Sequence, residues 1–267
     1  MSNRRIIITG ASEGIGRELA LQFARQGSQL ALAARNAGAL DQLVQECESA
    51  GGKAIAVPTD VADPAACTAL IDKTVAAFGG IDVLVNNAGI SMRSLLSDIE
   101  DLSIFDRVMR VNYLGSVYCT HAALPHLKAS KGLIVAVSSL QGKTGFPFSS
   151  GYSASKFAMQ GFFDSVRIEL NGTGVDVLIV FPGAVDTGIH TRKLEVDPKL
   201  AKQNWKPEQG SLMPVEECVR QMVRAMERRD RELVLTIQGK LIPWMRLVAP
   251  RFVDRAIASA IDRFYST

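Results

Sequence analysis

Long apolar runs are missing from this sequence. No run of 18 or more apolar residues occurs in its 267 residues, so the sequence predicts no membrane-spanning helix. Charge of one sign is also scarce, because 30 Lys and Arg residues stand against 27 Asp and Glu residues. A net charge of +3 is too small for a nucleic-acid-binding surface, so we expect no nucleic-acid partner. The apolar share of 47% excludes a disordered or fibrous chain.

Cysteine is rare and scattered. The four cysteines are Cys47, Cys67, Cys119 and Cys218. None forms a CxxC pair, so we expect neither a disulfide framework nor a metal site, but buried thiols typical of a reducing, cytoplasmic location. The apolar run Ile6–Ile8 is too short for a signal peptide, so we expect the first strand to begin at once.

Short β-branched runs alternate with helical periods along most of the chain. The expected strands are Arg4–Thr9, Leu30–Ala34, Ala54–Val57, Val83–Asn86, Leu133–Ser138, Val175–Phe181 and Glu232–Thr236. The expected helices include Ile15–Gln26, Leu40–Ala50, Pro64–Phe78, Ile104–Lys128 and Tyr152–Leu170. Strands that are apolar on both faces and separated by helices predict one three-layer α/β/α domain over residues 1–267, with a doubly wound parallel sheet.

Two regions break this alternation. Residues 188–213 contain His190, Trp205 and two prolines, and we interpret them as a substrate lid inserted over the ligand crevice. Residues 239–267 form an amphipathic tail with five basic and two acidic residues. The apolar positions of its second half fall on one helical face, at Phe252, Ala256, Ile257, Ala260, Ile261 and Phe264. This face either packs on the protein or a partner subunit, or lies in a membrane surface as a peripheral contact.

A glycine-rich turn follows the first expected strand. It reads Thr9-Gly10-Ala11-Ser12-Glu13-Gly14-Ile15-Gly16-Arg17, with a helix after it. Glycines let the backbone approach a pyrophosphate, and the helix N-terminus offers free N–H groups to it. The spacing GxxxGxG departs from GxGxxG, so a strand–helix turn without a ligand is the alternative.

The residues after the second expected strand indicate which dinucleotide is bound. NAD sites usually carry an acidic residue there, but this stretch reads Ala33-Ala34-Arg35-Asn36. Arg35 and the Ser12 hydroxyl could bind a 2′-phosphate, which favours NADP(H), although Glu13 must then turn away. The alternative is that Arg35 is a solvated surface charge. Asp60 and Val61 could contact the adenine, or Asp60 could cap the following helix.

The sequence Tyr152-Ser153-Ala154-Ser155-Lys156 opens a helix and carries the candidate chemistry. The i, i+4 spacing brings the phenol and the ammonium group to one face. A nearby cation is expected to lower the phenol pKa from about 10, so that Tyr152 can exchange a proton with a carbonyl or an alcohol. Ser139 ends the fifth strand. Asn112 interrupts a long helix, where its side chain could hold a water or a backbone carbonyl.

Taken together, the motifs TGxxxGIG, NNAG, Asn112, Ser139, YxxxK and PGxVxT resemble the short-chain dehydrogenase/reductases, and the surrounding sequence resembles hydroxysteroid-type members. The resemblance implies a Rossmann-type fold and a homodimer or homotetramer. It also implies Tyr152 as acid–base, Lys156 as its modulator and ribose anchor, Ser139 as the carbonyl-orienting donor, and Asn112 as support for a water relay. The expected cofactor-binding residues are Gly10, Ser12, Gly14, Ile15, Gly16, Arg35, Asp60, Val61, Asn87, Ala88, Gly89, Tyr152, Lys156, Pro182, Gly183, Val185 and Thr187.

These features predict an NADP(H)-dependent oxidoreductase that interconverts a ketone and a secondary alcohol. Phe146-Pro147-Phe148 lies between Ser139 and Tyr152 and is expected to form an apolar pocket wall, which favours a lipid- or steroid-like substrate. One alternative is an NADPH-binding regulator or scaffold without turnover, which would not need a tuned phenol. Another is an epimerase or dehydratase, although 267 residues leave little room for a larger substrate domain.

Overall fold

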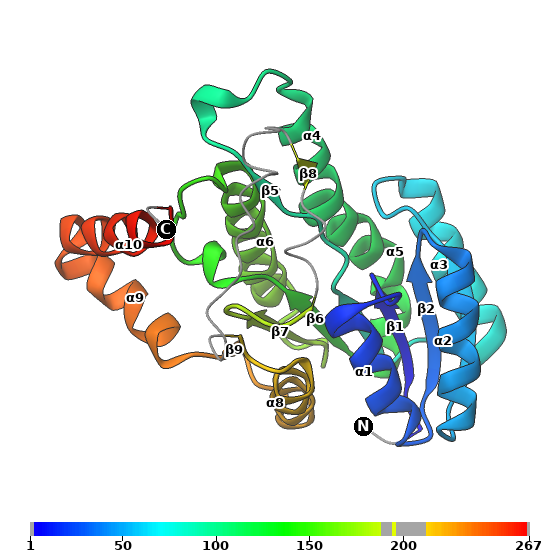
Figure 1. Cartoon of the computed structure of the whole chain (residues 1–267). Helices are drawn as coiled ribbons and strands as arrows, with labels where there is room; N and C mark the ends of the chain where they lie inside the picture. The colour runs from blue at the N-terminus through cyan, green and yellow to red at the C-terminus, as the bar shows by residue number, and fades with distance from the viewer. Residues whose placement is uncertain (1–2, 188–193, 196–211, 266–267) are drawn as a thin grey trace.

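A computed structural model describes residues 3–187, 194–195 and 212–265 of the chain. Its centre is a sheet of seven parallel strands (Figure 1). In spatial order these are β3 (Lys53–Pro58), β2 (Gln29–Ala34), β1 (Arg5–Thr9), β4 (Val83–Asn86), β6 (Leu133–Val137), β7 (Asp176–Phe181) and β9 (Glu232–Val234). Strand order reverses between β1 and β4, which confirms the predicted doubly wound sheet.

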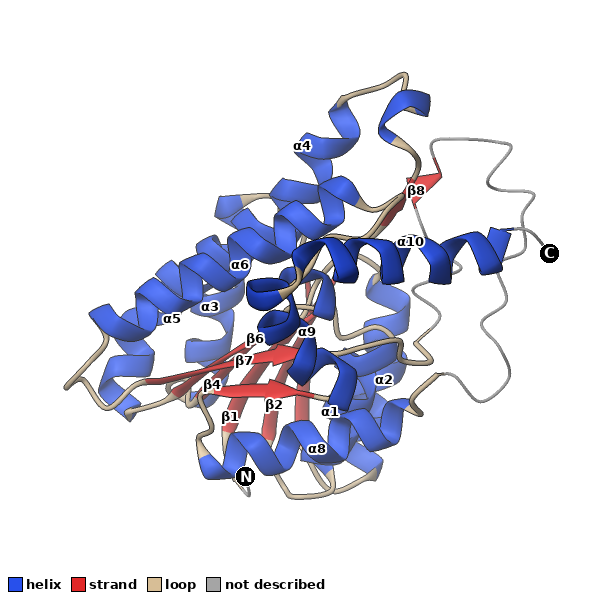
Figure 2. Ribbon diagram, turned by 90° about the vertical axis from the view of Figure 1, so that its left-hand side faces the viewer, coloured by secondary structure: helices blue, strands red, loops and turns tan. Residues whose placement is uncertain are grey.

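Helices cover both faces of this sheet (Figure 2). One face carries α1 (Gly14–Ala24), α2 (Ala37–Ser49) and α8 (Val215–Arg228). The other face carries α3 (Pro64–Phe78), α5 (Gly115–Ser130) and α6 (Ser150–Glu169). Two further helices, α9 (Ile237–Val248) and α10 (Pro250–Tyr265), extend from the β9 edge (Figure 1).

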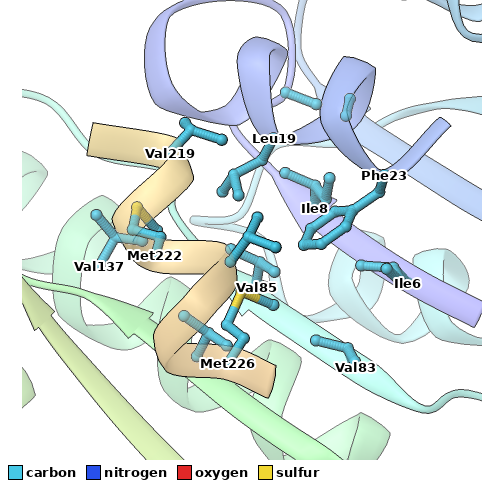
Figure 3. Close-up of a cluster of buried hydrophobic side chains, with 14 of the residues drawn as sticks. Ile6, Ile8, Leu19, Phe23, Val83, Val85, Val137, Val219, Met222 and Met226 are labelled. Atoms are coloured by element: carbon cyan, nitrogen blue, oxygen red, sulfur yellow. The ribbon is translucent and has the colours of Figure 1, made fainter. Parts of the chain in front are cut away.

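The core consists of two apolar layers, one on each face of the sheet. Alternate residues of β1 point to opposite layers: Ile6 and Ile8 face α1 and α8, whereas Ile7 faces α3 and α5. Figure 3 shows part of the first layer, in which the labelled side chains are Ile6, Ile8, Val83, Val85 and Val137 of the strands and Leu19, Phe23, Val219, Met222 and Met226 of the helices. Burying strand residues on both faces explains why the expected strands read as continuous apolar runs.

The largest difference from the sequence prediction is in the stretch expected as one helix over Ile104–Lys128. It consists of α4 (Ser103–Met109), a π-helical turn (Arg110–Leu114) and α5. The wider turn occurs around Asn112, whose side chain bonds to another part of the chain. Apolar periodicity cannot signal such an insertion, because the hydrophobic face continues on both sides of it.

Smaller differences occur elsewhere. A two-residue strand, β5 (Met92–Arg93), pairs in parallel with β8 (Leu194–Glu195). Neither was predicted, because two residues give no periodic signal. Most of the expected lid over 188–213 lies outside the described residues. No helix among those that the structure describes is long and apolar enough to cross a membrane.

Candidate active site

The turn after β1 lies at the reversal point of the sheet and is bonded to the end of β4. The Thr9 hydroxyl donates to the Val85 carbonyl at 3.2 Å and accepts from the backbone N–H groups of Asn87 and Ala88, each at 3.0 Å. The Asn87 side chain donates back to the carbonyls of Thr9 (2.9 Å) and Gly10 (3.1 Å). These bonds fix the two strand ends side by side, where open α/β sheets bind their ligands.

Gly10 and Gly16 keep this turn free of side chains. Gly10 has a φ of +64°, and a Cβ there would lie 2.8 Å from the Ala88 Cα atom. A Cβ on Gly16 would clash with the Gly10 carbonyl and lie 2.7 Å from the Asn87 side-chain nitrogen. The Glu13 side chain makes no capping bond to the first turn of α1, so the N–H groups there can meet a phosphate. A dinucleotide pyrophosphate fits this cradle.

Arg35 follows β2 directly and is exposed to solvent. The Ala11 N–H donates to the Ala33 carbonyl at 3.0 Å, which brings the glycine-rich turn, with Ser12, beside the end of β2. Arg35 and Ser12 therefore lie at neighbouring segments, as the NADP(H) prediction requires.

At the next strand, the Asp60 carboxylate accepts from the Ala62 N–H at 2.9 Å. Helix α3 is capped by Asp63, which accepts from the Ala65 N–H, so the alternative that Asp60 caps this helix is wrong. Val61 is buried and packs against Gly115 of α5. The exposed Asp60 and the buried Val61 thus form the end of this strand loop, where an adenine contact is predicted.

Ser139, Tyr152 and Lys156 lie together beyond the carboxyl end of β6. Ser139 caps a short turn (Leu140–Gly142), and its hydroxyl lies near enough to the Tyr152 phenol to lower the pKa of that phenol. The Lys156 ammonium group lies 5.6 Å from the centre of the Tyr152 ring and donates to the Val137 carbonyl at 2.9 Å. The structure therefore brings these three predicted residues to one place.

The ionisation of this group differs from the sequence prediction. Burial raises the pKa of the Tyr152 phenol, and its hydrogen bond with Ser139 lowers that pKa by less. Burial also lowers the pKa of Lys156 to about 8. The expectation that the lysine charge brings the tyrosine pKa down is wrong for the chain alone, because desolvation is the larger effect. At neutral pH the phenol keeps its proton.

Asn112 belongs to the same cluster. Its amide nitrogen donates to the Ile90 carbonyl (3.0 Å) and to the Ser155 hydroxyl (2.9 Å), and its amide oxygen accepts from the Ile90 N–H (2.8 Å). Holding a backbone carbonyl was one of the two predicted roles for this side chain. A Cβ on Gly89 would lie 3.3 Å from the Asn112 oxygen and 3.7 Å from the Lys156 nitrogen, so these residues converge on the NNAG turn.

The segment after β7 closes the site from the other side. The Pro182 carbonyl accepts from the Leu140 N–H at 3.0 Å, next to Ser139. Gly183 packs near Leu140, and Val185 is buried and bridges to Met213. Thr187 reaches the start of α1, where a Cβ on Gly14 would lie 3.0 Å from the threonine Cβ atom. The predicted cofactor contacts therefore lie along the carboxyl ends of β3, β2, β1, β4, β6 and β7.

Sequence reasoning missed two groups of supporting residues. Thr9 and Ser155 were not proposed as site residues, although Thr9 bonds the two cradle strands and Ser155 anchors Asn112. The Gln141 side chain accepts from Ser153 at 3.0 Å, which ties the loop after Ser139 to α6. The positions of Thr9 and Ser155 inside TGxxxGIG and YxxxK were the available signal, whereas nothing in the sequence marks Gln141.

An apolar cluster borders Tyr152. Met92, Ile104 and Val108 are fully buried, and Ile90, Ile99, Phe105 and Tyr152 pack against them. The Phe148 carbonyl accepts from the Ser94 N–H at 2.8 Å, so the predicted wall segment lies beside this cluster. The surroundings of the phenol are therefore mainly hydrocarbon.

Comparisons with known proteins agree with this geometry. The short chain dehydrogenase family matches residues 4–197. An 11-beta-hydroxysteroid dehydrogenase-like 4A protein of Arabidopsis thaliana is 35% identical over 254 residues, covering 95% of this chain and 83% of the relative. Dehydrogenase/reductase SDR family member 7B of Bos taurus is 36% identical over 266 residues, covering 96% and 81%.

Solved structures show the same fold. An alcohol dehydrogenase of Thermococcus sibiricus, complexed with 5-hydroxy-NADP, has a TM-score of 0.76 and 29% identity, covering 86% of this chain and 94% of that one. A short chain dehydrogenase/reductase of Burkholderia phymatum in complex with NAD has a TM-score of 0.84 at 24% identity, covering 94% and 95%. The chain belongs to the short-chain dehydrogenase/reductases, oxidoreductases that interconvert ketones and alcohols with a nicotinamide cofactor, and it has hydroxysteroid-dehydrogenase-like relatives.

Proposed function

We propose that the protein is an NADP(H)-dependent oxidoreductase for an apolar, lipid- or steroid-like ketone and its secondary alcohol. The observation that carries the proposal is the grouping of Ser139, Tyr152 and Lys156 at the carboxyl end of β6, beside the cradle of Gly10 and Gly16. A scaffold that only binds NADPH has no need of a buried acid next to a hydroxyl donor.

In this proposal the residues divide the work of carbonyl reduction. A nicotinamide cofactor, when bound, would supply the hydride for the carbonyl carbon. Ser139 donates a hydrogen bond to the carbonyl oxygen, and Tyr152 gives that oxygen its proton. The raised phenol pKa keeps this proton available at neutral pH. Lys156 stabilises the phenolate that is left, and Asn112 holds the Ile90 segment against the helix that carries Tyr152 and Lys156.

Tyr152→Phe tests the reaction. This variant removes only the hydroxyl, so we expect turnover of ketones to fall by about a thousandfold or more while NADPH binding stays within about threefold. Phe157→Tyr, on the exposed side of the same helix, is a matched control that should keep its activity. Retained turnover in Tyr152→Phe would refute the assignment, whereas NADPH binding without turnover of any carbonyl in the parent protein would favour the scaffold.

Arg35 supports the choice of NADP(H), because it replaces the acidic residue that NAD sites usually carry. We expect fluorescence titration to give tighter binding of NADPH than of NADH, and the preference to fall by about tenfold or more in Arg35→Ala. Arg107→Ala, which removes an exposed arginine on α4, should leave the preference intact. A parent protein that prefers NADH would contradict the proposal for this cofactor.

The hydrocarbon surroundings of Tyr152 support an apolar substrate. Burying one more methylene contributes about 0.8 kcal/mol, so kcat/KM for a series of 2-alkanones should rise by about threefold to fourfold per carbon until the pocket is filled. A flat series, or a preference for polyols, would count against an apolar pocket. This proposal also includes a homodimer or homotetramer, a cytoplasmic location, a lid over residues 188–213 and a single-domain organisation.

A further inference from the structure

Helices α9 and α10 form a hairpin that packs on the body through only part of its surface. The Thr236 hydroxyl caps α9 by accepting from the Gly239 N–H at 3.0 Å, and Gly239 lies against Leu140 and Val234. In α10, Val253 is buried with 3% exposure. The contacts of Gly239 fix the start of α9 against the loop that follows Ser139.

The opposite side is apolar and open to solvent. Its exposed large side chains are Ile237, Leu241, Trp244, Met245, Leu247 and Val248 of α9 and Phe252 of α10. The spacing of Ile237, Leu241, Trp244 and Val248 is that of a single helical stripe. Exposures run from 37% at Met245 to 86% at Val248. The other large exposed hydrophobic residues, among those described, are spread over α6 and the segment before α4, so this face is the main concentration of them.

The charges around this face have one predominant sign. Residues 237–259 contain the basic residues Lys240, Arg246, Arg251 and Arg255, and a single acidic residue, Asp254. Two copies of this chain that met through the face would bring these cations together and repel each other. An anionic partner would instead be attracted to the same ring of cations.

We propose that the α9–α10 face binds the surface of an anionic lipid bilayer, with its apolar stripe in the interfacial layer and its cations among the headgroups. Apolar side chains next to basic ones, with a tryptophan between them, are typical of helices that lie in the plane of a membrane. The exposed residues Lys240 and Arg251 lie before and after Trp244 in the sequence, where their charges can reach lipid phosphates while the indole is inserted.

The α9–α10 face lies close to the loop that carries Ser139. The Arg246 side chain donates to the Lys143 carbonyl at 2.9 Å, so the docking helix touches the loop that carries Ser139. A ketone dissolved in the bilayer would then be held close to the site. This last point rests on the proposed function, whereas binding to the bilayer does not.

Vesicle flotation with the full chain tests the binding without any turnover assay. We expect the protein to float with vesicles of phosphatidylcholine that contain about 30 mol% phosphatidylserine, and to bind pure phosphatidylcholine about tenfold more weakly or not at all. In a Trp205→Phe background, the emission of Trp244 should shift to shorter wavelength on binding. Equal binding to both vesicles, or no binding to either, would overturn the proposal.

Paired variants separate the face from general surface effects. Leu247→Ser should weaken vesicle binding by about tenfold. Ile168→Ser is its control, because Ile168 on α6 is also 77% exposed but lies away from the hairpin. The double variant Arg251→Glu/Arg255→Glu should abolish binding, whereas Lys73→Glu on α3 should not change it.

The oligomeric state decides between a membrane and a second copy of the chain. Sedimentation should give the same assembly for the parent protein and for Leu247→Ser. An assembly that dissociates in Leu247→Ser but not in Ile168→Ser would show that the face is a protein interface, and the proposal would fail. Loss of ketone reduction in Tyr152→Phe with unchanged flotation distinguishes the two proposals from each other.

Discussion

The buried ammonium group of Lys156 should make the folded chain less stable than a variant with an uncharged side chain at this position. Lys156 is 3% exposed, and burial lowers its pKa from 10.5 to about 8. That difference corresponds to about 3 kcal/mol against the charged form in the folded state near pH 7. Lys156→Met removes the charge but leaves the Val137 carbonyl without its donor, which costs about 1 kcal/mol. We expect the variant, although inactive, to be about 2 kcal/mol more stable than the parent.

The sign of the pH dependence follows from the same values. Between about pH 8 and pH 10.5 the unfolded chain holds a proton on Lys156 that the folded chain has lost, so this residue makes stability rise with pH. The advantage of Lys156→Met should therefore shrink by about 2 kcal/mol between about pH 7 and about pH 9.5. Urea unfolding of both proteins without cofactor, at one protein concentration, measures the difference. Lys73→Met, which replaces an exposed lysine on α3, is the control.

A variant less stable than the parent near pH 7 would refute this reasoning. A stability difference that stays constant over the pH range would refute it as well, because the charge of Lys156 would then not be the cause. Other groups that titrate in this range also change the free energy of unfolding, and comparing the two proteins at each pH cancels their contributions. The Tyr152 phenol is one of them, and its raised pKa makes stability fall as the pH rises.

Three further outcomes follow from the structure. Arg229→Met should lower the free energy of unfolding in urea by about 1–2 kcal/mol, because Arg229 bonds the Lys131 carbonyl at 2.9 Å and Asp176 at 2.7 Å; a loss below about 0.5 kcal/mol would mean that water replaces it. Gly16→Ala should weaken NADPH binding by about tenfold or more in a fluorescence titration, whereas Gly145→Ala, with nothing within 4 Å of its added methyl group, should bind normally; equal binding would refute the cradle. Asn112→Leu should cost about 2–3 kcal/mol in thermal or urea unfolding, because the buried polar groups it satisfies lose their partner, and an unchanged stability would contradict that role.

The order of the elements and the residues of the site could be predicted because both are local patterns. Runs such as Ile6–Ile8 are apolar on both faces of a strand, and the spacing of Tyr152 and Lys156 follows from helix geometry. The π-helical turn at Asn112 could not be predicted, since it depends on a bond to Ile90, 22 residues away. The raised tyrosine pKa could not be predicted either, because it depends on how many atoms surround the phenol.

The tail shows the same limit. Its amphipathic pattern was visible, but a pattern cannot say which apolar side chains are covered. The structure buries Val253, which was not assigned to the apolar face, and exposes Phe252, which was. It also exposes the α9 residues Trp244, Leu247 and Val248. Helix-to-helix packing decides this distribution, so the pattern alone could not predict which apolar residues of α9 and α10 are exposed.

The contacts of the Ser139 loop have a consequence for the order in which the enzyme is assembled during synthesis. The loop is bonded to α6 by Gln141, to β9 by the ion pair of Lys143 with Glu232 at 2.9 Å, and to α9 by Arg246. The Lys143 ammonium group also lies 3.9 Å from the centre of the Phe181 ring in β7. A growing chain therefore contains its whole Ser–Tyr–Lys set after residue 156 but has the full bracing of that set only about ninety residues later, when Arg246 has left the ribosome. We therefore expect activity to begin only after α9 has been made and has packed on the Ser139 loop.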